Sequence, residues 1–287
     1  LNNFPDSSID FIGQAHYHSL AGLFHDKKEF RWQINKHRDL IEDTFGHRPQ
    51  VMTNTELIYH NEVGKIASEE GYNGIFTEGV PRILGWRSQN HAYTQPDFVT
   101  ENGNNILLRN RKLTDDVGYR FSAEWWNEHP LTAEKYSSWL ANSQGDMLNL
   151  FMDYETFGEH HWKGTGILWF LEDLPQQVLK HENLKFAKVR EMAQKEPVGK
   201  FDAFEYNTVS WADREMDASA WLGNPMQKML FQKLQDIEAK VKRIDDPEVT
   251  EVWRKMLTSD HLHHICTKSY EDGNVHNYFS YFDHPHQ

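Results

Sequence analysis

The chain has 287 residues, with 43 acidic against 30 basic side chains, so its formal net charge is −13. That acidic balance argues against a nucleic-acid partner, which would require a basic face to displace counterions from phosphate. The longest apolar run, residues 167–171, is too short to span a membrane, and a single cysteine, Cys266, cannot form an internal disulfide.

Short apolar strands alternate with amphipathic helices along the first two thirds of the chain. We expect strands at residues 9–18 (running into a loop), 49–54, 74–78, 104–109 and 147–152. We expect helices at 28–45, 56–70, 132–141 and 167–182, the last interrupted by Pro175. This alternation is typical of parallel βα units.

After about residue 215 the pattern predicts helices only, at 224–243 and 247–257. We therefore expect a barrel-like catalytic domain at 1–200 and a helical region at 201–287, with the change near 195–205. In parallel barrels the reacting groups lie where strands end and loops begin. The candidate site residues are accordingly sought at the strand ends.

The first strand end carries His16 and His18, which would face the same side of an extended segment. Such a pair suits a divalent metal or a sugar hydroxyl, and it equally suits two polar loop residues.

Glu56 follows the second strand, where a carboxylate held ionised by hydrogen bonds would suit a nucleophile. The alternative for Glu56 is a first-turn residue that interacts with a helix dipole. Glu78 also ends a strand, and for it we prefer a structural anchor to a second acid.

A dense group of titratable residues follows the predicted strand at 147–152, comprising Asp153, Glu155, Glu159, His160 and His161. An apolar segment that delivers Asp153 should disfavour its charged form and raise its pKa. A general acid requires that property. A polar loop after a core strand explains this density of groups poorly, so we interpret the segment as functional.

Tryptophan is abundant, with 10 residues, and Trp211 and Trp221 flank Asp213 and Asp217. An indole face packs well on the apolar face of a sugar ring, and Asp213 could bind sugar hydroxyls. The alternative is a helix N-terminus capped by Ser210, with acidic residues in its first turns.

At these motifs the sequence resembles glycoside hydrolase family 57, close to its α-amylase-type members. The matching segments, in the family's order, are GQAHYHSL (13–20), NTELIY (54–59), FTEGVPRILG (76–85), LFMDYETFGEHHW (150–162) and SWADREMDASAWLGN (210–224). The resemblance implies an α/β fold, namely an incomplete seven-stranded (β/α) barrel followed by a helical region that closes over the active-site cleft. It also implies a retaining mechanism on α-1,4-linked glucans.

Residue by residue, the resemblance implies Glu56 as the nucleophile and Asp153 as the general acid/base. It places His18, Trp211 and Asp213 in segments that line the sugar site. We add Trp221 and His160 as candidate substrate-binding residues. The family usually opens with a strand that carries a His-Gln-Pro motif, and because this sequence has none, we expect an N-terminal part of the barrel to be missing from it.

Three alternatives stay open. One is a 4-α-glucanotransferase of the same family, in which a sugar hydroxyl replaces water as acceptor. Another is a metal-dependent hydrolase of a sugar substrate, with His16, His18, Asp153 and His160 as ligands of an ion that activates water. The third is a catalytically silent glucan-binding protein. The favoured interpretation needs no metal or other cofactor, takes an α-glucan oligosaccharide or polysaccharide as partner, and is expected in the cytoplasm.

Overall fold

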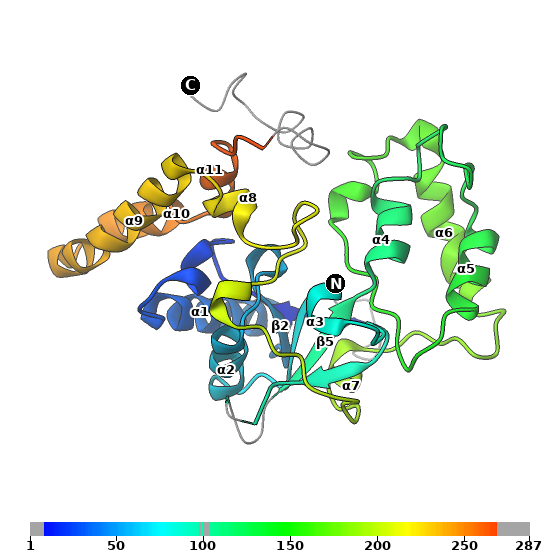
Figure 1. Cartoon of the computed structure of the whole chain (residues 1–287), viewed down its shortest axis with the longest axis horizontal. Helices are drawn as coiled ribbons and strands as arrows, with labels where there is room; N and C mark the ends of the chain where they lie inside the picture. Colours follow the sequence, from blue (N-terminus) through cyan, green and yellow to red (C-terminus); the bar gives the residue numbers. More distant parts are fainter. Residues whose placement is uncertain (1–8, 98, 100–103, 269–287) are drawn as a thin grey trace.

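The computed structural model describes residues 9–97, 99 and 104–268. Its centre is a five-stranded sheet in the order β1-β2-β3-β5-β4 (Figure 1). The strands are β1 Ile12–Gly13, β2 Val51–Thr53, β3 Gly74–Glu78, β4 Ala92–Thr94 and β5 Asn105–Arg109. The first three strands and β5 are parallel neighbours, whereas β4 pairs antiparallel with β5 at the sheet edge. The carboxyl ends of the parallel strands therefore lie on one edge of the sheet.

The parallel strands are buried on both faces. Every residue of β2, β3 and β5 is buried, which explains why their sequences are nearly continuous apolar runs instead of alternating ones. Glu78 and Arg109 end β3 and β5 in register with each other, as the last pair of the ladder. Two charged side chains are thus held together at the carboxyl edge of the sheet.

The helices begin and end largely where their local sequence signals predict. Gly46, with φ of 71°, ends α1, Thr132 caps α5 with its side chain, and Asn224 and Gln227 form a capping box on α9. The helices are α1 Lys28–Phe45, α2 Asn61–Glu69, α3 Pro81–Leu84, α4 Arg111–Gly118, α5 Ala133–Ala141, α6 Ile167–Val178, α7 Val189–Met192, α8 Ser219–Leu222, α9 Pro225–Ile244, α10 Pro247–Lys255 and α11 Ser259–His263. The predicted helices at 28–45, 132–141, 224–243 and 247–257 are confirmed.

The predicted strand at 147–152 is not a strand. It is extended chain joined to the sheet by a single parallel bridge between Asn149 and Arg109. The Asn149 side chain donates to the Leu108 carbonyl at 3.0 Å, and Arg109 Nε donates to the Phe151 carbonyl at 2.8 Å. Side-chain donors thus bind backbone carbonyls that would accept from backbone N–H groups if this segment were a strand of the sheet.

Other boundaries also differ from the sequence interpretation. The predicted helix at 56–70 starts only at α2, because Glu56 and Leu57 take left-handed φ values of 57° and 53°. Of the strand expected at 9–18, only β1 is paired. Pro175 lies inside α6 without interrupting it, and α6 ends at Val178. Strand β4 and helix α4 were not predicted.

The buried side chains form four clusters, and because two of them pack against the strands, we describe three units. The sheet unit surrounds the strands, the α4–α6 unit lies beside the sheet, and the C-terminal helical unit contains α8 to α11 (Figure 1). Representative buried residues are Phe30, Ile34, Ile75, Ile106 and Phe201 in the sheet unit, Val117, Tyr136, Ile167 and Phe170 in the α4–α6 unit, and Trp221, Phe231, Leu234 and Trp253 in the C-terminal helical unit.

The predicted α/β fold with a mainly parallel sheet is confirmed, and over the described residues the barrel is not closed. The division at residue 200 stays a prediction, and Phe201, Ala203 and Val209 pack in the core of the sheet unit. In the described part of the chain, no helix combines the length and the apolar character that crossing a membrane requires.

Candidate active site

Glu56 lies directly after β2, in a short 3₁₀ turn over Thr55–Leu57. Its φ of 57° is in the left-handed region, which a non-glycine residue occupies only at a cost of about 1–3 kcal/mol. Two hydroxyls hold the turn, since Ser210 Oγ donates to the Glu56 carbonyl at 2.9 Å and Thr77 Oγ1 donates to the Leu57 carbonyl at 2.8 Å. The Glu56 carboxylate therefore projects from a constrained turn and not from the first turn of a helix.

Side chains from three separate segments converge on the Glu56 carboxylate. Trp211 Nε1 donates to Oε2 at 2.8 Å, Ser259 Oγ donates to Oε1 at 3.0 Å, and His18 Nε2 lies 3.2 Å from Oε1. Burial alone would raise the pKa of Glu56, but the contacts with His18, Trp211 and Ser259 outweigh it and lower that pKa. Glu56 is thereby held as an ionised carboxylate.

His18 complements this charge. Burial would lower the pKa of His18, but its contact with Glu56 and the charges of Asp260 and Asp153 raise it. The backbone of His18 is itself left-handed, with φ of 50°. The imidazole and the carboxylate favour each other's charged forms.

The two histidines of the first motif have different neighbours. His16 packs edge-on against Tyr17, with ring centroids 4.7 Å apart, and burial and the Lys36 charge lower its pKa. The expectation of a shared face assumed an extended segment, but residues 15–18 form a turn, which is closed by the His18 N–H donating to the Ala15 carbonyl at 3.0 Å. Only His18 is directed to Glu56.

Asp153 lies just before the 3₁₀ turn Tyr154–Thr156, at a solvent-exposed position. Its pKa is raised, first by partial desolvation of the carboxyl group and then by the negative charges of Glu56 and Glu155, while the charges of His160 and His18 act in the opposite direction. Asp153 therefore lies within electrostatic reach of Glu56 and His18. We call His18, Glu56, Asp153, Trp211 and Ser259 the Glu56 cluster.

Trp211 connects the two carboxylates through packing. Its indole donates to Glu56 and meets the Phe151 ring edge-on, with centroids 5.9 Å apart. Phe151 precedes Asp153 by two residues. Trp211 is thus part of the cluster, as its sequence motif indicated.

Two other residues of that motif depart from the sequence interpretation. The Asp213 carboxylate is buried and accepts a hydrogen bond of 2.6 Å from Lys268, which also reaches Glu215 at 3.1 Å. Trp221 is only 1 % exposed, because its ring packs in the core of the C-terminal helical unit. Neither side chain joins the Glu56 cluster, and Trp221 offers no exposed face on which a sugar could stack.

Glu78 acts as an anchor, as its strand-end position suggested. It is fully buried, and its carboxylate pairs with Arg109 at 2.8 Å and accepts the Gly79 N–H at 2.8 Å. Both acceptor oxygens are therefore occupied by the protein itself.

Sequence reasoning missed Ser259, which begins α11 and lies 203 positions from Glu56. No local pattern marks it, because its contact with Glu56 depends on the packing of the C-terminal helical unit onto residues 14–19, the loop that follows β1. Ser259 N–H donates to the His18 carbonyl at 3.0 Å, and Ser19 bridges Thr258. Among the residues that the structure describes, no set of three His, Cys, Asp or Glu side chains is arranged to hold a metal ion.

Comparison with known proteins identifies the family. The sequence model of glycosyl hydrolase family 57 matches residues 6–205, more than half of the chain. The chain belongs to glycosyl hydrolase family 57. The resemblance inferred from the five motifs is confirmed, and both Glu56 and Asp153 lie within the matched residues.

A curated relative in Methanocaldococcus jannaschii, named "Putative alpha-amylase", is 46% identical over 287 residues, which covers 97% of this chain and 60% of that protein. The chain thus spans less than two thirds of the length of this relative.

Solved structures share the family fold at low sequence identity. A branching enzyme of the family from Thermococcus kodakaraensis superposes with a TM-score of 0.67 at 14% identity, over 94% of this chain and 62% of that one. A 4-alpha-glucanotransferase from Thermococcus litoralis gives a TM-score of 0.54 at 15% identity, over 84% of this chain and 36% of that one. These likenesses establish the fold.

Proposed function

We propose that this chain is the catalytic part of a retaining glycoside hydrolase that acts on α-1,4-glucans, with Glu56 as nucleophile and Asp153 as general acid/base. The observation that carries the proposal is the opposite tuning of these two carboxyl groups. Contacts from His18, Trp211 and Ser259 lower the pKa of Glu56, whereas partial desolvation and neighbouring negative charge raise the pKa of Asp153. Paired groups whose surroundings separate their pKa values divide the acid and base roles.

The proposed reaction has two displacements. Asp153 first donates its proton to the glycosidic oxygen while Glu56 Oε attacks the anomeric carbon, so that the leaving sugar departs with its hydroxyl restored. Asp153, now ionised, then removes a proton from water, whose oxygen attacks the anomeric carbon and releases Glu56. Direct attack by a carboxylate requires the two carboxyl groups to lie about 5–5.5 Å apart.

The substrate class is supported by family membership and by the names of the relatives, which refer to amylase, branching-enzyme and glucanotransferase activities. A sugar hydroxyl in place of water would make the chain a 4-α-glucanotransferase by the same two steps. We favour hydrolysis because the relative that is 46% identical to this chain bears an amylase name. The metal-dependent alternative is disfavoured because His16 packs against Tyr17, whereas His18 contacts Glu56.

The proposal is tested with Glu56→Gln, which preserves shape but removes the nucleophilic oxygen anion. Turnover of maltoheptaose should fall by about 10⁴-fold or more, while maltoheptaose binding persists. A matched variant, Glu62→Gln on α2, changes a half-exposed carboxylate outside the cluster and should retain activity. Products are separated by chromatography, and their anomers are assigned by NMR.

A 5-fluoro-α-glucosyl fluoride, which slows the second displacement, should add one glycosyl unit to the peptide that contains Glu56. Attachment to another residue, inverted product anomers, or activity of Glu56→Gln within tenfold of the parent would each contradict the proposal. Products longer than the substrate would show that the chain transfers glucan units to a sugar acceptor instead of hydrolysing the substrate. Binding to amylose with no product from the unaltered chain would show a silent binding protein.

A further inference from the structure

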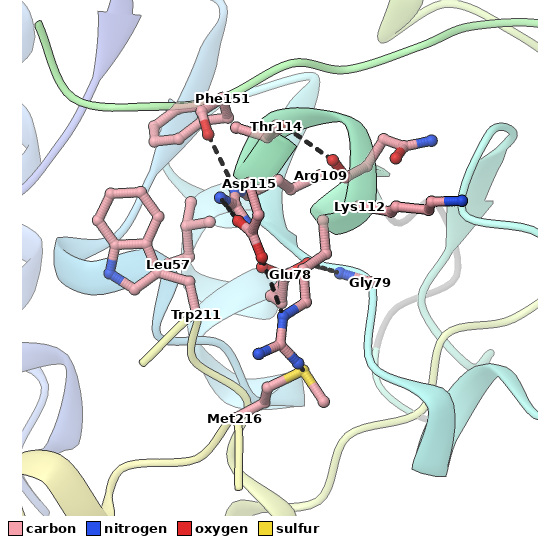
Figure 2. A network of polar contacts seen from close by, with 12 residues as sticks. Leu57, Glu78, Gly79, Arg109, Lys112, Thr114, Asp115, Phe151, Trp211 and Met216 are labelled. Carbon is pink, nitrogen blue, oxygen red and sulfur yellow. Dashed lines mark hydrogen bonds and ion pairs between the residues drawn. The ribbon is translucent and has the colours of Figure 1, made fainter. Parts of the chain in front are cut away.

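Arg109 is the centre of a buried polar network beside the Glu56 cluster (Figure 2). Its Nη1 lies 2.8 Å from Glu78 Oε2, its Nη2 lies 2.6 Å from Asp115 Oδ1, and its Nε donates to the Phe151 carbonyl at 2.8 Å. The side chain is only 5 % exposed. A planar guanidinium can serve three partners in fixed directions at once, which a lysine ammonium cannot reproduce.

The partners of Arg109 are themselves fixed. Glu78 ends β3 and accepts the Gly79 N–H, and Asp115 lies on α4 and is also paired with Arg111 at 3.4 Å. Buried charges are tolerated only when they are paired and hydrogen-bonded. The two buried carboxylates therefore hold the guanidinium in one orientation. The guanidinium is therefore a rigid point on the carboxyl edge of the sheet.

One arm of this network leads to Asp153. Arg109 Nε holds the Phe151 carbonyl, two residues before Asp153. Asn149, two residues before Phe151, is held at the end of β5 as well, because the Asn110 N–H donates to the Asn149 carbonyl at 2.8 Å. Of these two bonds, the one from Arg109 lies nearer to Asp153 along the chain.

The other arm leads to Glu56. The Arg109 guanidinium carbon lies 5.6 Å from the centre of the Trp211 ring, and Trp211 Nε1 donates to Glu56 Oε2. The Phe151 ring meets the same indole edge-on. Figure 2 shows Phe151 and Trp211 near Arg109, with the carboxylates of Glu78 and Asp115 beside the guanidinium.

We propose that Arg109 is a positioning residue that sets the separation of Glu56 and Asp153, by holding the Phe151 carbonyl on one side and the Trp211 indole on the other. This inference rests on the proposed function, in which both carboxylates must reach one anomeric carbon. A displacement of about 1 Å between reacting groups can cost 10²-fold in rate. Arg109 acts on the rate only through its neighbours.

The test is Arg109→Lys, which keeps a cation between Glu78 and Asp115 but loses the three-way geometry. The value of kcat on maltoheptaose should fall about 10- to 100-fold, while KM stays within threefold. Arg87→Lys is the matched control, because Arg87 also donates to three backbone carbonyls, those of Leu84, Ile83 and Lys200, and it touches no residue of the Glu56 cluster. Its kcat should stay within twofold of the parent.

If Arg109→Lys fails to fold, Asp115→Asn is the second test variant. It removes one of the two carboxylates that pair with the guanidinium and leaves the arginine in place. We expect a smaller loss of kcat, about three- to tenfold, again without a change in KM. An unchanged kcat, or an equal loss of kcat in Arg87→Lys, would overturn the inference. So would a loss that merely follows the folded fraction measured by circular dichroism.

A second readout does not depend on turnover. The pKa of Asp153 is followed by carboxyl ¹³C NMR, with and without Glu56→Gln, in the parent and in Arg109→Lys. The parent should show a fall in the pKa of Asp153 when the Glu56 charge is removed, and this fall should shrink by at least half in Arg109→Lys. An inactive parent chain would refute the proposed function alone. An undiminished fall in Arg109→Lys would refute the role of Arg109.

Discussion

Glu56 and Asp153 are both carboxylic acids, and only their neighbours distinguish them. Glu56 is surrounded by donors, which stabilise its charge. The charge of Asp153 is instead disfavoured, first by desolvation of its carboxyl group and then by the negative charges of Glu56 and Glu155. Asp153 retains contact with solvent, so its neighbours can be changed without disturbing a core. The charges around Asp153 therefore offer a direct probe of its protonation.

Removing single charges near Asp153 should move the alkaline limb of the pH–rate profile in opposite directions. In the proposed mechanism the active form has Asp153 protonated, so activity should be lost as the pH rises through its pKa. Glu155→Gln removes a charge that raises this pKa, and the limb should shift by about 0.5 unit to lower pH. His160→Gln removes a charge that lowers it, and the limb should shift to higher pH. The measurement is kcat/KM against pH.

The acid limb is the internal control in this experiment. In the proposed mechanism it reports Glu56, whose pKa depends mainly on burial and on the contacts with His18, Trp211 and Ser259, so it should stay in place. Shifts of the same sign in both variants would show that Asp153 does not govern the alkaline limb. Attenuation of both shifts at high salt would agree with their electrostatic origin.

The sequence predicts the residues of the site that stand at strand ends or in specific motifs, and it misses the long-range ones. Glu56, Asp153, His18 and Trp211 lie in motifs and come together in the structure. Ser259 joins them through the docking of a helix, which leaves no local pattern. Asp213 and Trp221 show the converse, because Lys268 and the helical core occupy side chains whose motif suggested sugar contact.

At the scale of elements, Glu29 joins three helices. It lies in the first turn of α1, fully buried, and pairs with Arg254 of α10 at 2.7 Å and with Lys242 of α9 at 2.9 Å. A buried carboxylate between two cations is costly to remove, because Arg254 and Lys242 then each lose a charged partner at a buried position. Glu29 thereby fastens the C-terminal helical unit, which carries Ser259, to the sheet unit.

Glu29→Gln should destabilise the fold by about 2 kcal/mol, seen as a fall of roughly 5 °C in the midpoint of thermal unfolding. The control is Glu42→Gln on the same helix, since Glu42 forms an exposed ion pair with Arg48. Exposed pairs contribute about 0–1 kcal/mol, so this variant should change the midpoint by no more than about 2 °C. Equal effects of the two changes would show that Glu29 does not join the helices.

The helices were more predictable than the strands for a physical reason. Helix signals are local, as in the capping box of Asn224 and Gln227 or the left-handed Gly46. Strand identity depends on pairing with distant segments, and residues 147–152 have the right composition but form only the bridge of Asn149 to Arg109. Strand β4 is three residues long and lies at an edge, so its sequence carries little periodic signal.

At the scale of the whole molecule, the Glu56 cluster lies where the three packing units meet. The sheet unit supplies Glu56, the segment between α5 and α6 supplies Asp153, and α11 of the C-terminal helical unit supplies Ser259. The backbone couples these parts as well, because the Ser259 N–H donates to the His18 carbonyl. A sugar bound at the cluster would therefore contact all three units at once.

Ligand binding should slow amide hydrogen exchange in all three units together. The inactive Glu56→Gln chain is incubated with maltoheptaose at about 100 times its Kd, where binding stabilises the bound state by about 2.7 kcal/mol, or up to 100-fold in exchange rate. The reporting amides are those of Leu57, Thr156 and Ser259, which donate to the carbonyls of Asn54, Asp153 and His18. A β-linked oligosaccharide of glucose is the control and should protect none of them. Protection of a single unit would place the sugar elsewhere, because a glucan seated between Glu56 and Asp153 restricts the opening of every segment that supplies the cluster.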